Sequence, residues 1–89
     1  MTKLYTIYGR VQGVGFRHFT YRQAMALGIT GYVKNRSDGS VEVLAQSESE
    51  GALEDFQQRL KTGPSFARVD DITISEQEAN RHYGDFVIE

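Results

Sequence analysis

The sequence contains no cysteine among its 89 residues. Disulfide bonds and thiolate chemistry are therefore excluded, and a zinc ion would have to be bound by histidines and carboxylates alone. The two histidines, His18 and His82, lie far apart in the chain, and neither belongs to an HExxH motif. We therefore expect no metal site.

Long apolar runs are also missing from the chain. No run approaches the roughly 20 apolar residues of a membrane-spanning helix, and the start of the sequence, MTKLY, lacks the long apolar core of a signal peptide. We therefore expect a cytoplasmic protein with no membrane partner. A length of 89 residues, of which 39% are hydrophobic, fits a single domain over residues 1–89 with one hydrophobic core.

Acidic side chains are absent from residues 1–36, although the net charge of the whole chain is −2. This segment carries six basic side chains, whereas residues 37–89 carry four basic and twelve acidic ones. Two interpretations stay open: charges scattered over solvated surfaces, or a local positive field around an anion site built from the first third. The six basic residues are Lys3, Arg10, Arg17, Arg22, Lys34 and Arg36.

Two periodicities predict the secondary structure of the first half of the chain. Alternating aromatic and β-branched residues predict a strand over residues 4–10. An apolar stripe at helical spacing predicts a helix that begins at Phe16 and is ended by Gly28. Two further strands, over residues 29–35 and 41–46, are separated by turn-forming residues and are expected to form a hairpin.

The second half is predicted to contain one more helix and two more strands. Ser47 or Ser49 is expected to cap the helix, and a Gly-Pro pair ends it. Leu53, Phe56 and Leu60 mark one apolar face of this helix. The two strands are expected over residues 69–74 and 85–88, with the polar run 75–84 between them.

The order strand, helix, strand, strand, helix, strand, with a short C-terminal strand added, predicts an α+β fold of the ferredoxin-like type. This split βαβ sandwich has a mostly antiparallel sheet with two helices on one face. A βαβ crossover makes the first two strands parallel, so their C-terminal ends lie at the same edge of the sheet. Arg17 follows the first strand and Asn35 ends the second, and we expect the two side chains to converge on one site.

The loop VQGVGFR, residues 11–17, places two glycines and an arginine where a strand passes into a helix. It matches neither GxGxxG, since His18 takes the place of the third glycine, nor a P-loop. Free N–H groups at the start of a helix can form a concave nest that fits a phosphate, and Arg17 adds a planar, bidentate donor. The alternative is a glycine turn beside a solvated arginine. The predicted phosphate-binding residues are Gln12, Gly13, Val14, Gly15 and Phe16.

Several segments of the chain carry a resemblance to a known family. They are GRVQGVGFR at residues 9–17, LGITGYVKN at 27–35, DGSV at 38–41 and the connection over 63–69. With the length and the element order, they resemble the acylphosphatases over essentially the whole chain. One departure is Tyr32, where many members carry tryptophan, and this conservative change puts little in doubt.

The resemblance implies a hydrolase that splits the carboxyl–phosphate bond of acyl phosphates into a carboxylate and inorganic phosphate. It implies direct attack of a positioned water, with no metal, no cofactor and no covalent intermediate. The arginine that closes the first family motif binds the phosphoryl group together with the loop amides, and it corresponds to Arg17. The asparagine of the second motif positions the water and corresponds to Asn35. A small acyl phosphate is then the partner, inorganic phosphate is product and inhibitor, and we expect a monomer.

Two other functions stay open at this point. The chain could be a non-catalytic or specialised module that binds acyl or carbamoyl phosphate, because larger hydrogenase-maturation proteins begin with a domain whose loop is similar to residues 13–17. The same sandwich also recognises RNA, and residues 28–31 mimic a GxxG loop. That segment runs straight into a strand, and no basic and aromatic RNP1 pattern follows, so we expect no nucleic-acid partner.

Three residues next to the loop have more than one interpretation. His18 could tune the site or be an ordinary polar residue in an exposed first helical turn. Phe19 and Tyr21 could form a wall against the acyl group, pack in the core or lie on the surface.

Overall fold

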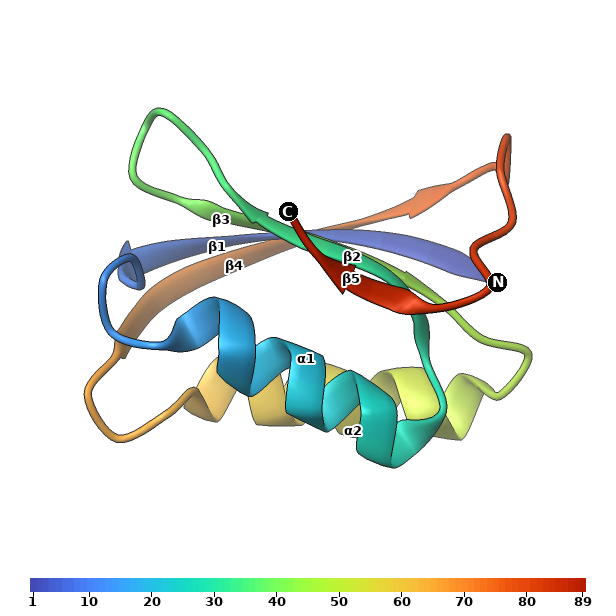
Figure 1. The fold of residues 1–89 in the computed structure, drawn as a ribbon, viewed down its shortest axis with the longest axis horizontal. Coiled ribbons are helices and arrows are strands. Elements are labelled where there is room, and N and C mark those ends of the chain that lie inside the picture. Colours follow the sequence, from blue (N-terminus) through green and yellow to red (C-terminus); the bar gives the residue numbers. More distant parts are fainter.

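Two helices lie side by side against one face of a five-stranded sheet in the computed structural model, which describes residues 1–89 (Figure 1). The expected element order and the ferredoxin-like α+β fold are confirmed. Neither helix has the length and apolar character that a membrane crossing requires. The elements are β1 (Thr2–Arg10), α1 (Phe16–Leu27), β2 (Thr30–Asn35), β3 (Val41–Gln46), α2 (Glu50–Thr62), β4 (Arg68–Gln77) and β5 (Phe86–Ile88).

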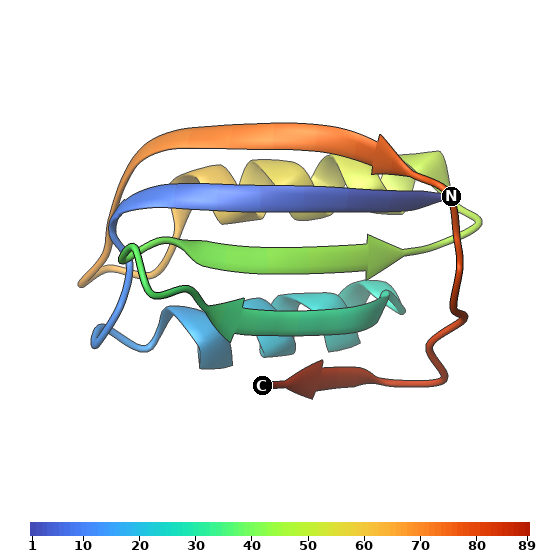
Figure 2. The ribbon, with the colours of Figure 1, turned by 90° about the horizontal axis from the view of Figure 1, so that it is seen from above.

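The strands follow the order β4-β1-β3-β2-β5 across the sheet (Figure 2). β1 and β2 both run antiparallel to β3 and are therefore parallel to each other, whereas β2 and β5 form the one directly parallel pair. The sheet is thus mostly antiparallel, as expected. The C-terminal ends of β1 and β2 lie at the same edge, which is the edge where the sequence places its candidate site.

β4 is longer than the sequence predicts. The polar run was expected to begin at Ser75, but the strand continues to Gln77. The reason is its partner, because β4 pairs with β1 along its whole length, from Arg10 opposite Arg68 to Thr2 opposite Gln77. Backbone pairing maintains the strand there although residues 75–77 are exposed, so a hydrophobic pattern could not reveal it.

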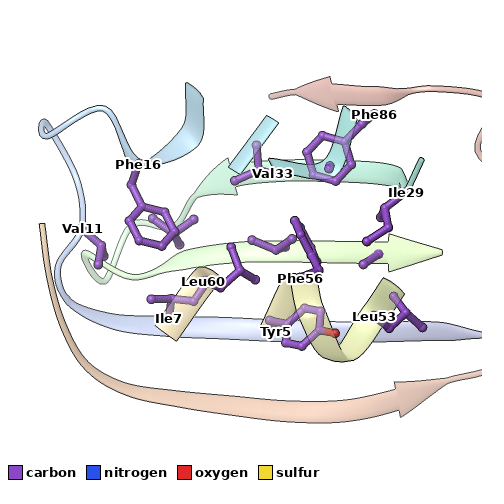
Figure 3. Packing of buried hydrophobic residues seen from close by; sticks show 14 residues of the cluster. Tyr5, Ile7, Val11, Phe16, Ile29, Val33, Leu53, Phe56, Leu60 and Phe86 are labelled. Carbon is purple, nitrogen blue, oxygen red and sulfur yellow. The ribbon is translucent and has the colours of Figure 1, made fainter. Parts of the chain in front are cut away.

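The core lies between the sheet and the two helices (Figure 3). Phe56 on α2 contacts Tyr5 and Phe86 through edge-on ring packing, with centroid separations of 6.1 Å and 6.3 Å. Of the two candidate caps of α2, Ser49 is the one used, and its Oγ accepts a hydrogen bond from the N–H of Ala52 at 3.1 Å. The predicted helix faces are confirmed, since the buried helix residues are Phe16, Thr20, Ala24, Leu53, Phe56 and Leu60.

Candidate active site

A pocket of about 210 Å³ opens where the loop after β1 meets the start of α1 and the ends of β2 and β5. In Figure 2, β2 and β5 both point towards the edge at which α1 begins. The structure therefore brings Arg17 and Asn35 to one pocket, as the βαβ argument predicts. The residues that line it are Val11, Gly13, Gly15, Phe16, Arg17, His18, Asn35 and Ile88.

The two loop glycines are required by backbone conformation. Gly13 and Gly15 have φ angles of +74° and +81°, in the left-handed region that other residues rarely adopt. A Cβ atom at either position would meet no atom within 4 Å, so space does not limit the choice. The glycines bend the chain around the pocket and leave its backbone uncovered.

The loop's N–H groups are available to a ligand. None of the backbone N–H groups from Gln12 to Arg17 donates to a backbone carbonyl, and the first such bond runs from the Phe19 N–H to the Gly15 carbonyl, at 3.0 Å. α1 has no side-chain cap and no acidic residue in its first turn. The positive end of the helix dipole therefore lies at the pocket, and these N–H groups have no backbone acceptor within the protein.

Arg17 holds its charge at this pocket without an acidic side-chain partner. Its Nη1 donates to the backbone oxygen of Glu89 at 2.9 Å, and the Glu89 N–H donates to the Val33 carbonyl at 2.8 Å. No carboxylate side chain forms an ion pair with Arg17. The guanidinium is thus oriented by Glu89, the residue that follows β5, and keeps further donors for an anion.

The basic residues of the first third of the chain do not gather around the pocket as a group. Lys34 and Arg36 form ion pairs with Glu42, with N–O separations of 3.6 Å and 3.4 Å. Of the six basic residues in the first third, Arg17 is the one that lines the pocket. The positive charge at the site therefore comes from one arginine and the helix N-terminus.

The Gln12 side chain has a role that the sequence did not reveal. Its Nε2 donates to the carbonyl oxygens of Arg36 and Ser40, at 2.8 Å and 2.9 Å, and so ties the loop to the β2–β3 turn. Neither Gln12 nor Val14 is among the residues that line the pocket, and Val14 packs against the core. For these two predicted phosphate-binding residues, the backbone N–H is the group that can face a ligand.

The turn that Gln12 binds is itself fixed by short-range hydrogen bonds. The hydroxyl and the N–H of Ser40 both donate to Oδ1 of Asp38, at 2.5 Å and 2.9 Å. These bonds, and the nearby charge of Arg36, hold the pKa of the Asp38 carboxyl below its usual range. The turn after Asn35 is therefore a rigid support for the loop.

Replacing Gln12 with alanine is expected to lower kcat by about tenfold or more for acyl phosphate hydrolysis, the activity that the family resemblance implies. The variant loses both bonds between the loop and the turn after Asn35, and a small misalignment of reacting groups is costly. Steady-state kinetics with benzoyl phosphate measure the effect. Gln23→Ala is the matched control, because Gln23 accepts a hydrogen bond from Arg59 away from the pocket. A kcat within twofold of the parent would contradict the positioning role.

Of the three interpretations of Phe19 and Tyr21, a wall against the acyl group is not the one that the structure supports, because neither residue lines the pocket. Phe19 lines a separate hollow between the two helices. Tyr21 packs against the core, 6.5 Å from the Phe86 ring, and stacks on His18 at 6.2 Å. His18 and Ile88 line the pocket instead. Ile88 was not predicted from the sequence, because no motif includes it. The alternation of side chains along the last strand could have indicated it, because Ile88 lies on the same face of the strand as Phe86.

Tyr32, the departure from the usual family pattern, does not line the candidate site; its side chain lines a different hollow together with Asn80 and Tyr83. Its hydroxyl donates to Oε2 of Glu42 at 2.6 Å. Burial, followed by this hydrogen bond and the charge of Glu42, raises the pKa of the tyrosine well above its usual value. The residue therefore acts as a neutral hydrogen-bond donor in the strand pair that carries Asn35.

Fold and pocket together define a small α+β protein with a candidate oxyanion site at a helix N-terminus. The family model for acylphosphatases matches residues 3–88. An acylphosphatase of Actinobacillus succinogenes is 48% identical over 85 residues, which cover 96% of this chain and 93% of the relative. The crystal structure of acylphosphatase from Bacillus subtilis is 40% identical, with a TM-score of 0.94 and coverage of 99% and 97%. The crystal structure of T. kodakarensis HypF matches with a TM-score of 0.87 at 34% identity, over 100% of this chain but 12% of that one.

The chain belongs to the acylphosphatase family. It hydrolyses acyl phosphates, as the relatives that match it over nearly their full length indicate.

Proposed function

We propose that the loop N–H groups of residues 12–17 and the Arg17 guanidinium together hold the phosphoryl group of the substrate. The observation that carries this proposal is the pocket itself. Arg17 and Asn35 come from different elements and both line it, beside loop N–H groups that have no backbone acceptor. Phosphoryl transfer requires stabilisation of negative charge on the equatorial oxygens. A fixed guanidinium and a set of preorganised N–H groups supply that stabilisation at little reorganisation cost. Inorganic phosphate, as the product, would bind the same groups and inhibit.

Asn35 is the group proposed to position the attacking water. It ends β2, where pairing with Val41 on β3 fixes its backbone. An amide can accept a hydrogen bond from water through Oδ1 and donate to a phosphoryl oxygen through Nδ2. In a loose transition state the water needs orientation more than deprotonation, so no carboxylate base is required.

The leaving group needs no general acid. Cleavage of the P–O bond to the acyl oxygen releases a carboxylate, whose conjugate acid has a pKa of about 4. The carboxylate can leave unprotonated near neutral pH, while the water oxygen forms the new bond to phosphorus and its proton passes to solvent or to the phosphate formed. The proposed reaction thus involves neither a covalent intermediate nor a metal.

The test is the initial rate of benzoyl phosphate hydrolysis in the presence of a metal chelator. The parent is expected to remain active, and Asn35→Ala is expected to lower kcat by about a hundredfold, with inhibition by inorganic phosphate largely unchanged. Asn80→Ala is the matched control, since Asn80 lines a different hollow at the other end of the sheet. Equal activity of the Asn35 and Asn80 variants would refute the water-positioning role.

The same experiment separates catalysis from simple binding. A folded parent that binds inorganic phosphate but gives only background hydrolysis would instead be a non-catalytic acyl phosphate module. We also propose that residues 1–89 act as one domain, since one hydrophobic core joins the sheet to both helices, and that the protein is a monomer. A cytoplasmic location stays a prediction, which fractionation of expressing cells would test.

A further inference from the structure

We propose that Ile88 contacts the acyl group and makes the site favour acyl phosphates with an apolar acyl group, such as an aromatic ring. This inference rests on the proposed phosphate site and concerns the acyl half of the substrate, which would lie against the Ile88 side chain. Ile88 is not covered by the loop motifs, and no reaction step requires it. Its role is therefore one of specificity.

The alternation of β5 directs Ile88 towards the site. Phe86 is 3% exposed and packs in the core, so it faces the helices. Successive side chains of a strand alternate between faces, so Ile88 lies on the helix side like Phe86 and Val87 lies on the open side. In the parallel pairing with β2, Ile88 is opposite Val33, two residues before Asn35.

Ile88 is the one apolar side chain of the pocket that a ligand can reach. Of the other apolar residues in the lining, Val11 and Phe16 are each 1% exposed and belong to the core. Ile88 is 43% exposed. A phosphoryl group held by the loop and Arg17 occupies the polar part of the pocket, and its acyl substituent must project towards the mouth. Contact with Ile88 there would remove apolar surface of both partners from water.

The position of Ile88 is fixed before a ligand arrives. The backbone on either side of it is held to β2, because the Gly31 N–H donates to the Asp85 carbonyl at 3.0 Å and the Glu89 N–H donates to Val33 at 2.8 Å. A fixed apolar contact costs little ordering entropy on binding. It would also disfavour an acyl group that carries a carboxylate, since that charge would lose water without gaining a partner.

The experiment compares kcat/KM for benzoyl phosphate and acetyl phosphate in three proteins: the parent, Ile88→Ala and Val87→Ala. Val87 is a matched control because it is 41% exposed on the same strand but does not line the pocket. In Ile88→Ala the benzoyl-to-acetyl ratio is expected to fall about fivefold, while inhibition by inorganic phosphate stays within twofold of the parent. Val87→Ala should leave the ratio unchanged, and Ile88→Leu should restore most of it.

Three results would overturn the inference while leaving acyl phosphate hydrolysis intact. The ratio could stay constant in Ile88→Ala, it could fall equally in both alanine variants, or the inhibition constant for phosphate could rise as much as the ratio falls. The last two would mean that the change acts by loosening β5 and the Arg17 contact. If the folded parent hydrolyses neither substrate, the proposed function itself fails, which is a distinguishable outcome.

Discussion

Replacing Arg17 with alanine is expected to lower kcat/KM for benzoyl phosphate by about a thousandfold and to abolish inhibition by inorganic phosphate. Groups that stabilise transition-state charge by directed hydrogen bonds typically contribute factors of this size. Both effects are expected together because, in the proposed function, the same guanidinium binds the substrate, the transition state and the product. Steady-state kinetics and phosphate competition measure them. If phosphate inhibited the alanine variant as strongly as it inhibits the parent, Arg17 could not be part of the phosphate site.

The structure offers two controls for this prediction. Arg22 lies on the same helix and is exposed, but it does not line the pocket. Arg22→Ala therefore removes one positive charge from α1, as Arg17→Ala does, and should leave kcat/KM within about twofold of the parent value. Arg17→Lys keeps the charge but loses the planar fork, so its activity should fall between those of the parent and the alanine variant. Arg17 is itself exposed, and none of these variants is expected to unfold the protein.

Gly31→Ala is expected to lower the free energy of unfolding by more than about 3 kcal/mol. An added Cβ would lie 1.9 Å from the carbonyl oxygen of Leu44 on the neighbouring strand, and the φ angle of +138° already disfavours a side chain. Relief would require β2 and β3 to separate, and typical domains have only about 5–15 kcal/mol of stability in total. Urea unfolding followed by circular dichroism measures the loss.

Gly51→Ala is the contrasting substitution. Gly51 lies in the first turn of α2 with an ordinary φ angle, and the nearest atom to an added Cβ is the Ser49 hydroxyl oxygen at 3.9 Å. Alanine is expected to raise stability there by about 0.5–1 kcal/mol, because it restricts the unfolded chain. If both glycine variants destabilised equally, the steric account of Gly31 would be wrong.

The fold and the meeting of Arg17 with Asn35 could be predicted from the sequence because local patterns determine them. Apolar stripes defined the buried faces of both helices, and turn residues defined the β2–β3 hairpin. The parallel strands of a βαβ unit placed two strand ends at the same edge of the sheet. None of these inferences needs a side-chain position. The resemblance added the roles of the two residues, which stay predictions.

The parts that could not be predicted depend on long-range partners. The last residues of β4, up to Gln77, are held by backbone pairing with β1 and show no apolar alternation. The bonds of Gln12 to the turn and the approach of Ile88 to the loop both require knowledge of which segments meet in space. Phe19 and Tyr21 were candidates because of proximity in the sequence, but neither lines the pocket.

If Arg17 binds the phosphoryl group as proposed, catalysis depends on the three-residue edge strand β5. It lies at the edge of the sheet and pairs with β2 alone, yet it holds in place Glu89, whose backbone oxygen accepts a hydrogen bond from Arg17 across a separation of 72 residues. Short edge elements open locally at a fraction of the free energy of global unfolding. Local opening of β5 would release the guanidinium while both helices and the other four strands stay folded. If Arg17 acts as proposed, moderate denaturation is expected to produce a native-like but inactive population, and activity would then report the order of a single edge strand.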